Sequence, residues 1–134
     1  MIDTADLHRT AREYLRAAKL LRTRKSYDAA VYLCGYAVEI ALKARICKTL
    51  KWTSGFPRTN SEFQEKGTLL KTHNFQLLLE YTAMQDDIFA RLLPEWSEVC
   101  LWSPEQRYDA PGTKTRAEAD KMIEATQILL RKLL

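Results

Sequence analysis

Six residues between positions 28 and 43 form a polar stripe along a segment that is otherwise apolar. On an α-helix all six fall within an arc of about 100°. Polar groups on a buried helix are costly unless they are paired, so these side chains must face a partner, a groove or solvent. The members of this polar stripe are Asp28, Tyr32, Gly35, Tyr36, Glu39 and Lys43.

Glu39 and Lys43 stand four residues apart, with the carboxylate nearer the N-terminus. This is the favourable order for an ion pair within one helix. The pair is either a structural contact at a partly exposed edge or part of a polar binding groove. Tyr32, Tyr36 and Gly35 beside it offer either an aromatic stacking face or a helix–helix or dimer contact, because tyrosine and a small residue suit both.

His73 and the Arg107-Tyr108 pair are the other candidates for chemistry. The imidazole of His73 can transfer protons near neutral pH, while its place at a helix start also suits a hydrogen-bonded structural histidine. The guanidinium of Arg107 can make a bidentate contact with a phosphate, or with a buried carboxylate such as Glu39.

Metal and cofactor sites are not predicted. The three cysteines, Cys34, Cys47 and Cys100, form no CxxC motif, and neither histidine stands at ligand spacing from a cysteine. Neither GxGxxG nor GxxxxGK[ST] occurs. We therefore expect three reduced, mostly buried thiols, no metal and no cofactor.

Hydrophobic periodicity predicts two long helices at the start of the chain. The first spans about residues 4–23, with apolar residues on one face and basic residues on the opposite face. The second spans about residues 26–50 after the N-cap Ser26, and it is apolar almost all the way round, as a central buried helix is. The basic ridge of the first helix consists of Arg9, Arg12, Arg16 and Lys19.

The rest of the chain predicts shorter helices and two irregular segments. Pro94 either kinks a helix or opens a new turn. The last helix begins at the capping box Thr115-x-x-Glu118. The expected order is a long connection over 51–72 with a short helical piece at 61–66, helices over 74–84 and 86–101, a segment of turns at 103–112, and a helix from 115 to the end. Within 103–112, Ser103 is the expected cap of a short turn with Pro104 at its first position, and residues 107–112 are irregular.

Composition agrees with an all-α fold. Leu and Ala number 34, Val and Ile number 9, and there are only 4 Gly and 4 Pro, which favours helix and leaves too few turns for a β-sandwich. With 134 residues, we expect a single domain over 1–134. The predicted architecture is an up-and-down bundle of four to five helices around a central apolar second helix.

The net charge of +4 is unevenly distributed. Residues 1–58 hold 12 basic and 5 acidic side chains (+7), whereas residues 59–134 hold 9 basic and 12 acidic ones (−3). The basic half is either a footprint for nucleic acid or phosphate, or a solvated helix surface. The longest apolar stretch, 29–42, is shorter than the roughly 20 residues of a membrane span, and the first ten residues lack an apolar signal core, so we expect a cytoplasmic protein.

Four segments together resemble a known family. In chain order they read AREYLRAAKLL, SYDAAVYLCGYAVEIALKARI (26–46), LKTHNFQLLL (70–79) and WSPEQRY (102–108). In this order they resemble the HEPN domain (higher eukaryotes and prokaryotes nucleotide-binding). That family has an Ala-rich second helix ending in Glu-x-x-x-Lys, then a Thr-His-Asn/Asp step, and an Arg-Tyr pair before the last helix. The resemblance covers essentially the whole chain.

The resemblance implies a nucleotide- or RNA-binding helical module, usually a homodimer with a groove near its two-fold axis. It also implies a nucleotidyltransferase-like protein partner and a toxin–antitoxin or defence context. In this interpretation Glu39 accepts from a ribose hydroxyl or orients Arg107, and Lys43 lies near phosphate. The candidate ligand-binding residues are Glu39, Lys43, Tyr32, Tyr36, Arg107, Tyr108 and His73.

The sequence departs from the family in one respect. Many members are metal-independent RNases with an Arg-x(4–6)-His motif, but here neither histidine follows an arginine at that distance. The chain therefore resembles the branch without the motif, and we expect binding without catalysis. Two alternatives stay open: an RNase toxin that uses Arg107, His73 and Glu39, and a structural adaptor with no ligand.

Overall fold

The computed structural model describes residues 1–134 and is all-α, as predicted. It contains seven α-helices and two short 3-10 helices, without a named strand. No helix combines the length and the apolar content needed to span a bilayer. The elements are α1 (Thr4–Thr23), α2 (Tyr27–Thr49), α3 (Asn60–Lys66), η1 (Thr68–Leu70), α4 (Phe75–Tyr81), α5 (Gln85–Arg91), α6 (Leu93–Val99), η2 (Pro104–Tyr108) and α7 (Arg116–Leu133).

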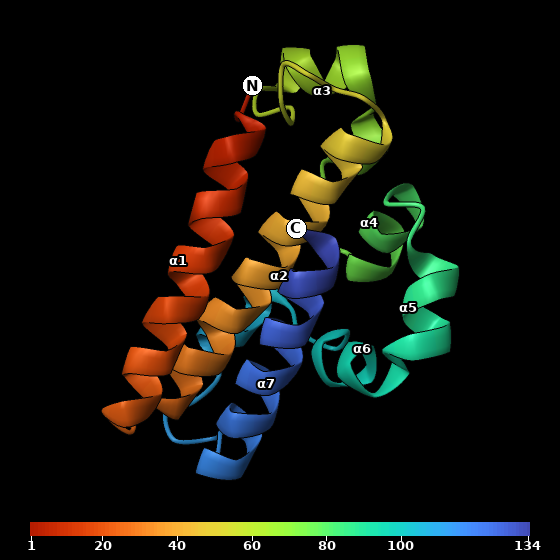
Figure 1. Cartoon of the computed structure of the whole chain (residues 1–134). Helices are drawn as coiled ribbons and strands as arrows, with labels where there is room; N and C mark the ends of the chain where they lie inside the picture. Colours follow the sequence, from red (N-terminus) through yellow and green to blue (C-terminus); the bar gives the residue numbers. More distant parts are fainter.

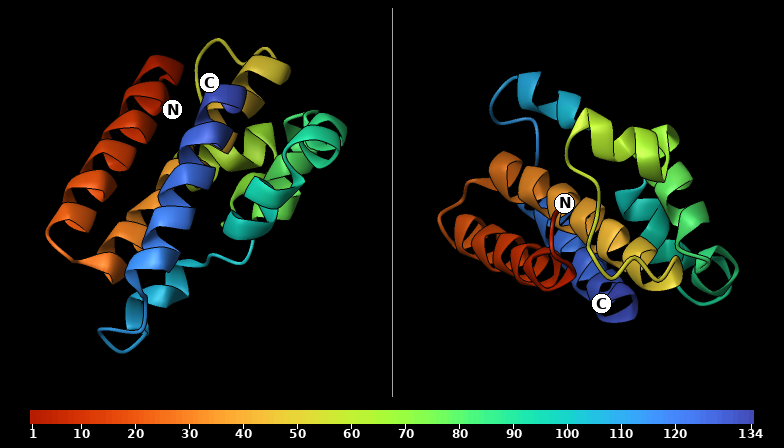
Figure 2. Two further views of the ribbon diagram at one scale, coloured as in Figure 1. Left: turned by 60° about the horizontal axis from the view of Figure 1, so that its bottom comes forward. Right: turned by 90° about the horizontal axis from the view of Figure 1, so that it is seen from above.

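The second helix is central, as its apolar composition predicts. α1 and α7 run along α2 on one side, and α4 and η2 also pack against it (Figure 1). Seen from above, η2 lies on the side of α2 away from α1 and α7 (Figure 2). Twelve of the 23 residues of α2 are buried. Its apolar surface is therefore covered within one chain.

The first helix has the predicted bounds and two faces. Asp3 is its N-cap, because the Asp3 side chain accepts hydrogen bonds from the backbone N–H groups of Ala5 and Asp6. The buried face consists of Leu7, Ala11, Leu15 and Ala18, whereas Tyr14 is only half-buried. The basic ridge is exposed and partly neutralised, since ion pairs join Arg9 to Asp6 and Arg16 to Glu13.

The connection over residues 51–72 is tied to the start of the chain. The backbone N–H of Ile2 donates to the Phe56 carbonyl at 2.7 Å, and the Phe56 N–H donates back to Ile2 at 2.9 Å. The predicted short helix at 61–66 is confirmed as α3, which begins at a capping box between Thr59 and Glu62. Buried Phe56 and Phe63 pack edge to face.

The middle of the chain is more broken than expected. The helix predicted over 74–84 ends at Tyr81, before Ala83, whose φ is +59°. The segment predicted as 86–101 forms two helices, α5 and α6, that meet at Leu92. Of the two alternatives at Pro94, the structure has the new turn: Pro94 lies in the first turn of α6, where its missing N–H costs nothing.

The last two elements begin at the predicted caps. The Ser103 hydroxyl accepts from the backbone N–H of Glu105, and Pro104 follows at the first position of η2. The Thr115 hydroxyl accepts from the backbone N–H of Glu118 at the start of α7. Ser26, by contrast, makes no side-chain capping bond to α2.

Candidate functional site

Glu39 is the centre of the polar stripe and is only 4% exposed. Its Oε1 lies 2.5 Å from Nδ1 of His73, and its Oε2 accepts from Nζ of Lys43 at 3.2 Å. Both carboxylate oxygens therefore have a cationic or polar partner, as a buried carboxylate requires. The predicted intrahelical ion pair between Glu39 and Lys43 is present. His73 joins it from a segment 34 residues away.

His73 is held by the loop that starts α4. The Thr72 hydroxyl accepts from the backbone N–H of Asn74, and the Asn74 side chain accepts from the N–H of Leu77. Phe75, directly after this cap, is buried and stacks on Trp102, which anchors the helix start. The His73 side chain is 59% exposed, so one edge of the imidazole contacts Glu39 while the ring stays open to solvent.

Aromatic side chains surround the other half of the polar stripe. Tyr36 contacts Tyr32 and Trp102 edge to face, with ring centroids 5.2 and 4.9 Å apart. Trp102 rests on Gly35, where any Cβ would overlap the indole. The sequence left open whether Tyr32, Tyr36 and Gly35 form an aromatic stacking face or a packing contact. In the structure they pack against η2 and the residues before it, within the same chain.

The hydroxyl groups of Tyr32 and Tyr36 form a hydrogen bond with each other. The Tyr36 and Tyr32 hydroxyls lie 3.4 Å apart. This hydrogen bond, with burial and the nearby Glu39 charge, raises the pKa of Tyr36 to about 12. Tyr36 is therefore a neutral phenol at physiological pH and can donate a hydrogen bond to a ligand.

Arg107 and Tyr108 lie on η2 beside the tyrosines. The Arg107 guanidinium stands over the Tyr108 ring at 4.8 Å, and both residues are exposed, Tyr108 by 72%. The Tyr108 and Tyr32 hydroxyls raise the pKa of Arg107. The suggested pair of Arg107 with Glu39 is not formed, because His73 and Lys43 already occupy both oxygens of that carboxylate.

Asp28 belongs to the polar stripe in sequence but not to this site. Its carboxylate accepts from the backbone N–H groups of Gly112 and Lys114, at 2.5 and 2.7 Å, and from the Thr113 hydroxyl. These hydrogen bonds lower the pKa of Asp28, and the bond from the Gly112 N–H has the largest effect. Asp28 thus anchors the loop between η2 and α7.

The structure brings the candidate residues together in two adjoining groups on one side of α2. Glu39, Lys43 and His73 form the first, and the second contains Tyr32, Tyr36, Arg107 and Tyr108. Trp102, which is not among the candidate residues predicted from the sequence, is the buried support of the second group. The sequence feature that could have indicated this role is Gly35, because an indole can approach the helix backbone this closely only where no Cβ is present.

The structure contains free cysteines and no cluster of metal-ligand side chains. All three cysteines are free, and burial raises the pKa of the Cys34 thiol to about 12. Cys34 therefore stays a protonated thiol rather than a nucleophilic thiolate. No group of three or more His, Cys, Asp or Glu side chains is placed to hold a metal ion.

Comparison with known proteins finds similarity to one family, over part of the chain. Neither the curated proteins nor the solved structures include a match to this chain. The family model of the HEPN domain matches residues 4–59. This segment contains α1, α2 and every member of the polar stripe, whereas His73, Arg107 and Tyr108 lie beyond it. The resemblance found in the sequence is thus confirmed over residues 4–59, which are similar to the HEPN domain, and the later motifs of that resemblance lie outside the matched segment.

Proposed function

We propose that this chain is a nucleotide- or RNA-binding module in which the polar side of α2 and η2 receives the ligand. The observation that carries the proposal is the Arg107-Tyr108 pair, an exposed guanidinium stacked on an exposed ring. A guanidinium binds phosphate in bidentate fashion, and a tyrosine ring stacks on any nucleobase. Lys43 and His73 add polar donors on the same side of α2.

The part played by Glu39 in this proposal is positioning. Both of its oxygens are occupied and the residue is 4% exposed, so it has little surface left for a ribose hydroxyl. Instead, Glu39 holds the Lys43 ammonium and the His73 imidazole in place. Those two side chains, which are 17% and 59% exposed, then contact the ligand.

RNA binding can be measured by fluorescence anisotropy with a labelled single strand of about twelve nucleotides at low salt. We expect Arg107→Ala and Tyr108→Ala each to weaken binding about tenfold, since stacking and phosphate contacts are worth about 1–3 kcal/mol each. Both residues are exposed, so the fold should persist. Arg107→Ala should also reduce the slope of log affinity against log salt by about one.

The matched control is Arg131→Ala, which removes an exposed arginine of α7. It should change RNA affinity far less than Arg107→Ala does. An absence of binding at low salt, where phosphate contacts are strongest, contradicts the proposal and favours the adaptor without a ligand. Equal losses in both arginine variants mean that binding follows net charge and not this site. ATP and GTP titrations test free nucleotides in the same way.

The remaining features of the proposal come from the sequence itself and from the family resemblance. We place the module in the cytoplasm as a single domain over residues 1–134, and as a homodimer. Its partner is a nucleotidyltransferase-like protein in a toxin–antitoxin or defence system. The apolar second helix lends the dimer no support, because α1, α7 and α4 cover it within one chain.

A second candidate function is favoured by the contact between Glu39 and His73. A carboxylate 2.5 Å from Nδ1 orients an imidazole and leaves Nε2 free for proton transfer. With Arg107 to stabilise phosphate charge, this arrangement suits a metal-independent RNase. The test is cleavage of labelled RNA in excess chelator, where His73→Ala should abolish cleavage but leave RNA binding within a few-fold. Intact RNA after prolonged incubation with the wild type rejects catalysis.

A further inference from the structure

A groove between α6 and α7 lies outside the site described above. At one end, a cavity of about 240 Å³ opens between α2, α6, η2 and α7. A second hollow of about 210 Å³ lies along α6 and α7, and Glu98 lines both. Lys43, His73, Arg107 and Tyr108 line neither hollow. We call the two hollows together the α6–α7 groove.

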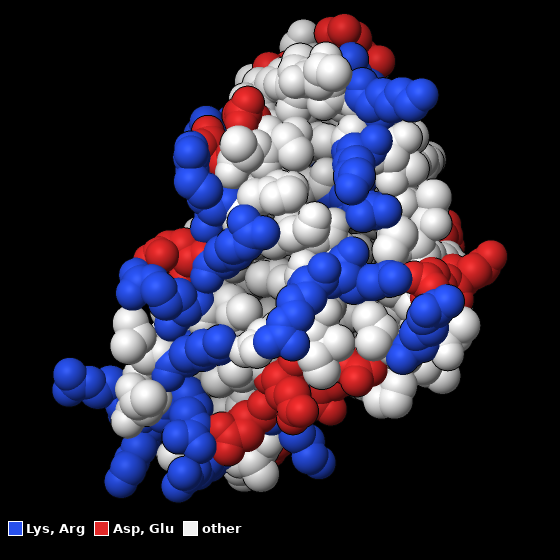
Figure 3. All heavy atoms as spheres, in the orientation of Figure 1, with Lys and Arg blue, Asp and Glu red and all other residues white.

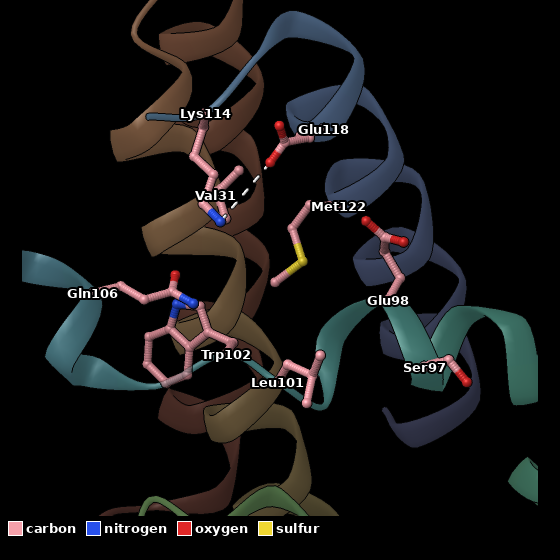
Figure 4. A pocket seen from close by; sticks show the side chains of 9 residues that line it. All are labelled: Val31, Ser97, Glu98, Leu101, Trp102, Gln106, Lys114, Glu118 and Met122. Carbon is pink, nitrogen blue, oxygen red and sulfur yellow. Dashed lines mark ion pairs between the residues drawn. The ribbon is translucent and has the colours of Figure 1, made fainter. Parts of the chain in front are cut away.

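The cavity has an apolar floor and an exposed apolar mouth. Val31, Met122 and Trp102 are buried around it, while Leu101 is 85% exposed (Figure 4). An isolated exposed leucine is ordinary, but this one adjoins a cavity that is large enough for one side chain. An apolar side chain inserted there would cover Leu101 and contact Met122 and Val31.

Trp102 forms a buried wall of the same cavity. The residue is 5% exposed, and its Nε1–H makes no hydrogen bond. The nitrogen has almost no accessible surface of its own and lies against the α2 backbone at Gly35. The indole therefore offers an occupant of the cavity its apolar ring and not its N–H group.

The rim of the α6–α7 groove is acidic. Four glutamates and two lysines line it, and Lys114 is already paired with Glu118 at 3.9 Å. Asp and Glu side chains gather over α6 and the lower part of α7 (Figure 3), on a protein whose net charge is +4. Such a rim repels phosphate and attracts cations. The charged lining residues are Glu95, Glu98, Glu118, Glu124, Lys114 and Lys121.

We propose that the α6–α7 groove binds a basic segment of a partner protein. One apolar side chain of the segment enters the cavity beside Trp102. Its lysine or arginine side chains pair with Glu98 and Glu124. The groove uses none of the side chains proposed to contact RNA and carries the opposite charge, although Trp102 supports both regions.

The probe is a phage-displayed library of random peptides, selected against the intact protein and followed by titration of the enriched peptides. We expect enrichment of Lys and Arg around at least one large apolar residue. The double variant Glu98→Lys/Glu124→Lys should weaken these peptides at least about tenfold, and so should Leu101→Asp. All three residues are exposed, so the variants should fold, which circular dichroism verifies.

The matched control is Glu80→Lys, which reverses an exposed charge on α4 away from the groove. It should leave peptide affinity unchanged, and added salt should weaken binding to the wild type. The proposal is overturned if the library yields no enrichment, if the enriched peptides are acidic or uncharged, or if their affinity is insensitive to the groove variants. RNA binding serves as the separate readout for the proposed function and should survive Leu101→Asp.

Discussion

At the scale of the residue, the contact between Gly35 and Trp102 decides the shape of the site. The indole lies against the backbone of α2, supports Tyr32 and Tyr36, and forms one wall of the α6–α7 cavity. A single methyl group at position 35 therefore affects both proposed binding regions. Helix propensity favours alanine at this position, whereas packing against the indole requires glycine.

Gly35→Ala should destabilise the protein although alanine is the better helix former. The gain in helix propensity is at most about 1 kcal/mol, while overpacking against the indole costs about 1–3 kcal/mol. Urea unfolding should show a net loss, with altered near-UV dichroism from displaced Trp102. The control Ala29→Gly, at an exposed position of α2, should cost only the propensity term. A Gly35→Ala protein as stable as the wild type contradicts the close contact.

Lys43→Met should lower the free energy of unfolding by about 1–3 kcal/mol, because it leaves the buried Glu39 carboxylate without its ammonium partner. Lys43→Arg keeps a cation there and should lose less. Adding Glu39→Gln to Lys43→Met should recover part of the loss, since no buried charge then remains. Chemical denaturation of the wild type, the single variants Lys43→Met and Glu39→Gln, and their double variant measures this coupling. Strictly additive effects would show that the two side chains do not interact.

At the scale of the element, α2 is tied to the loop before α7 by the hydrogen bonds to Asp28. This contact joins the first turn of one long helix to the approach of another, 84 residues later in the chain. It also fixes the position from which η2 presents Arg107. The loop between η2 and α7 is thus part of the architecture of the site.

Asp28→Asn should loosen this loop and remove part of the acid sensitivity of the fold. The folded pKa of Asp28 is lowered, so its stabilising contribution is complete above the ordinary aspartate pKa of about 4 and is lost as the pH falls below it. The difference in unfolding free energy between wild type and variant should therefore shrink from about pH 6 to about pH 3. A constant difference over that range contradicts the assignment. Faster tryptic cleavage at Lys114 in the variant is an independent readout.

At the scale of the whole molecule, both groups of candidate residues are complete in one chain. The proposed dimer must then use other surface, and an interface of ordinary size would cover about 800 Å² of the 7703 Å² that one chain exposes. Large exposed apolar side chains suited to it are dispersed over several elements. Outside both proposed binding regions they include Leu20, Leu69 and Leu93.

Light scattering at micromolar concentration should give a mass near twice the 15.5 kDa of the chain. A mass near 15.5 kDa rejects the dimer but leaves the RNA proposal standing, because the site needs no residue from a second copy. The dimer proposal and the RNA-binding proposal can therefore be rejected independently of each other. Measuring RNA anisotropy and mass on the same sample distinguishes them.

Much of the fold could be predicted because local rules decide it. Apolar periodicity predicted α1 with its observed bounds, and side-chain caps at Thr115 and Ser103 predicted where α7 and η2 begin. The division into α5 and α6 was less certain, because Pro94 permits either a kink or a new helix. Packing of Ile88 and Trp96 into the core accompanies the break at Leu92.

The sequence by itself determined an all-α chain with a central apolar helix, because residue composition and helical periodicity are local properties. It also determined the Glu39–Lys43 pair, since four residues on a helix place two side chains on one face. Only the tertiary structure decided that His73 takes the second oxygen of Glu39, that Arg107 remains outside this pair, and that Asp28 serves a loop. These partners lie 34 to 86 residues apart in the chain, so their meeting depends on how the helices pack and not on local spacing.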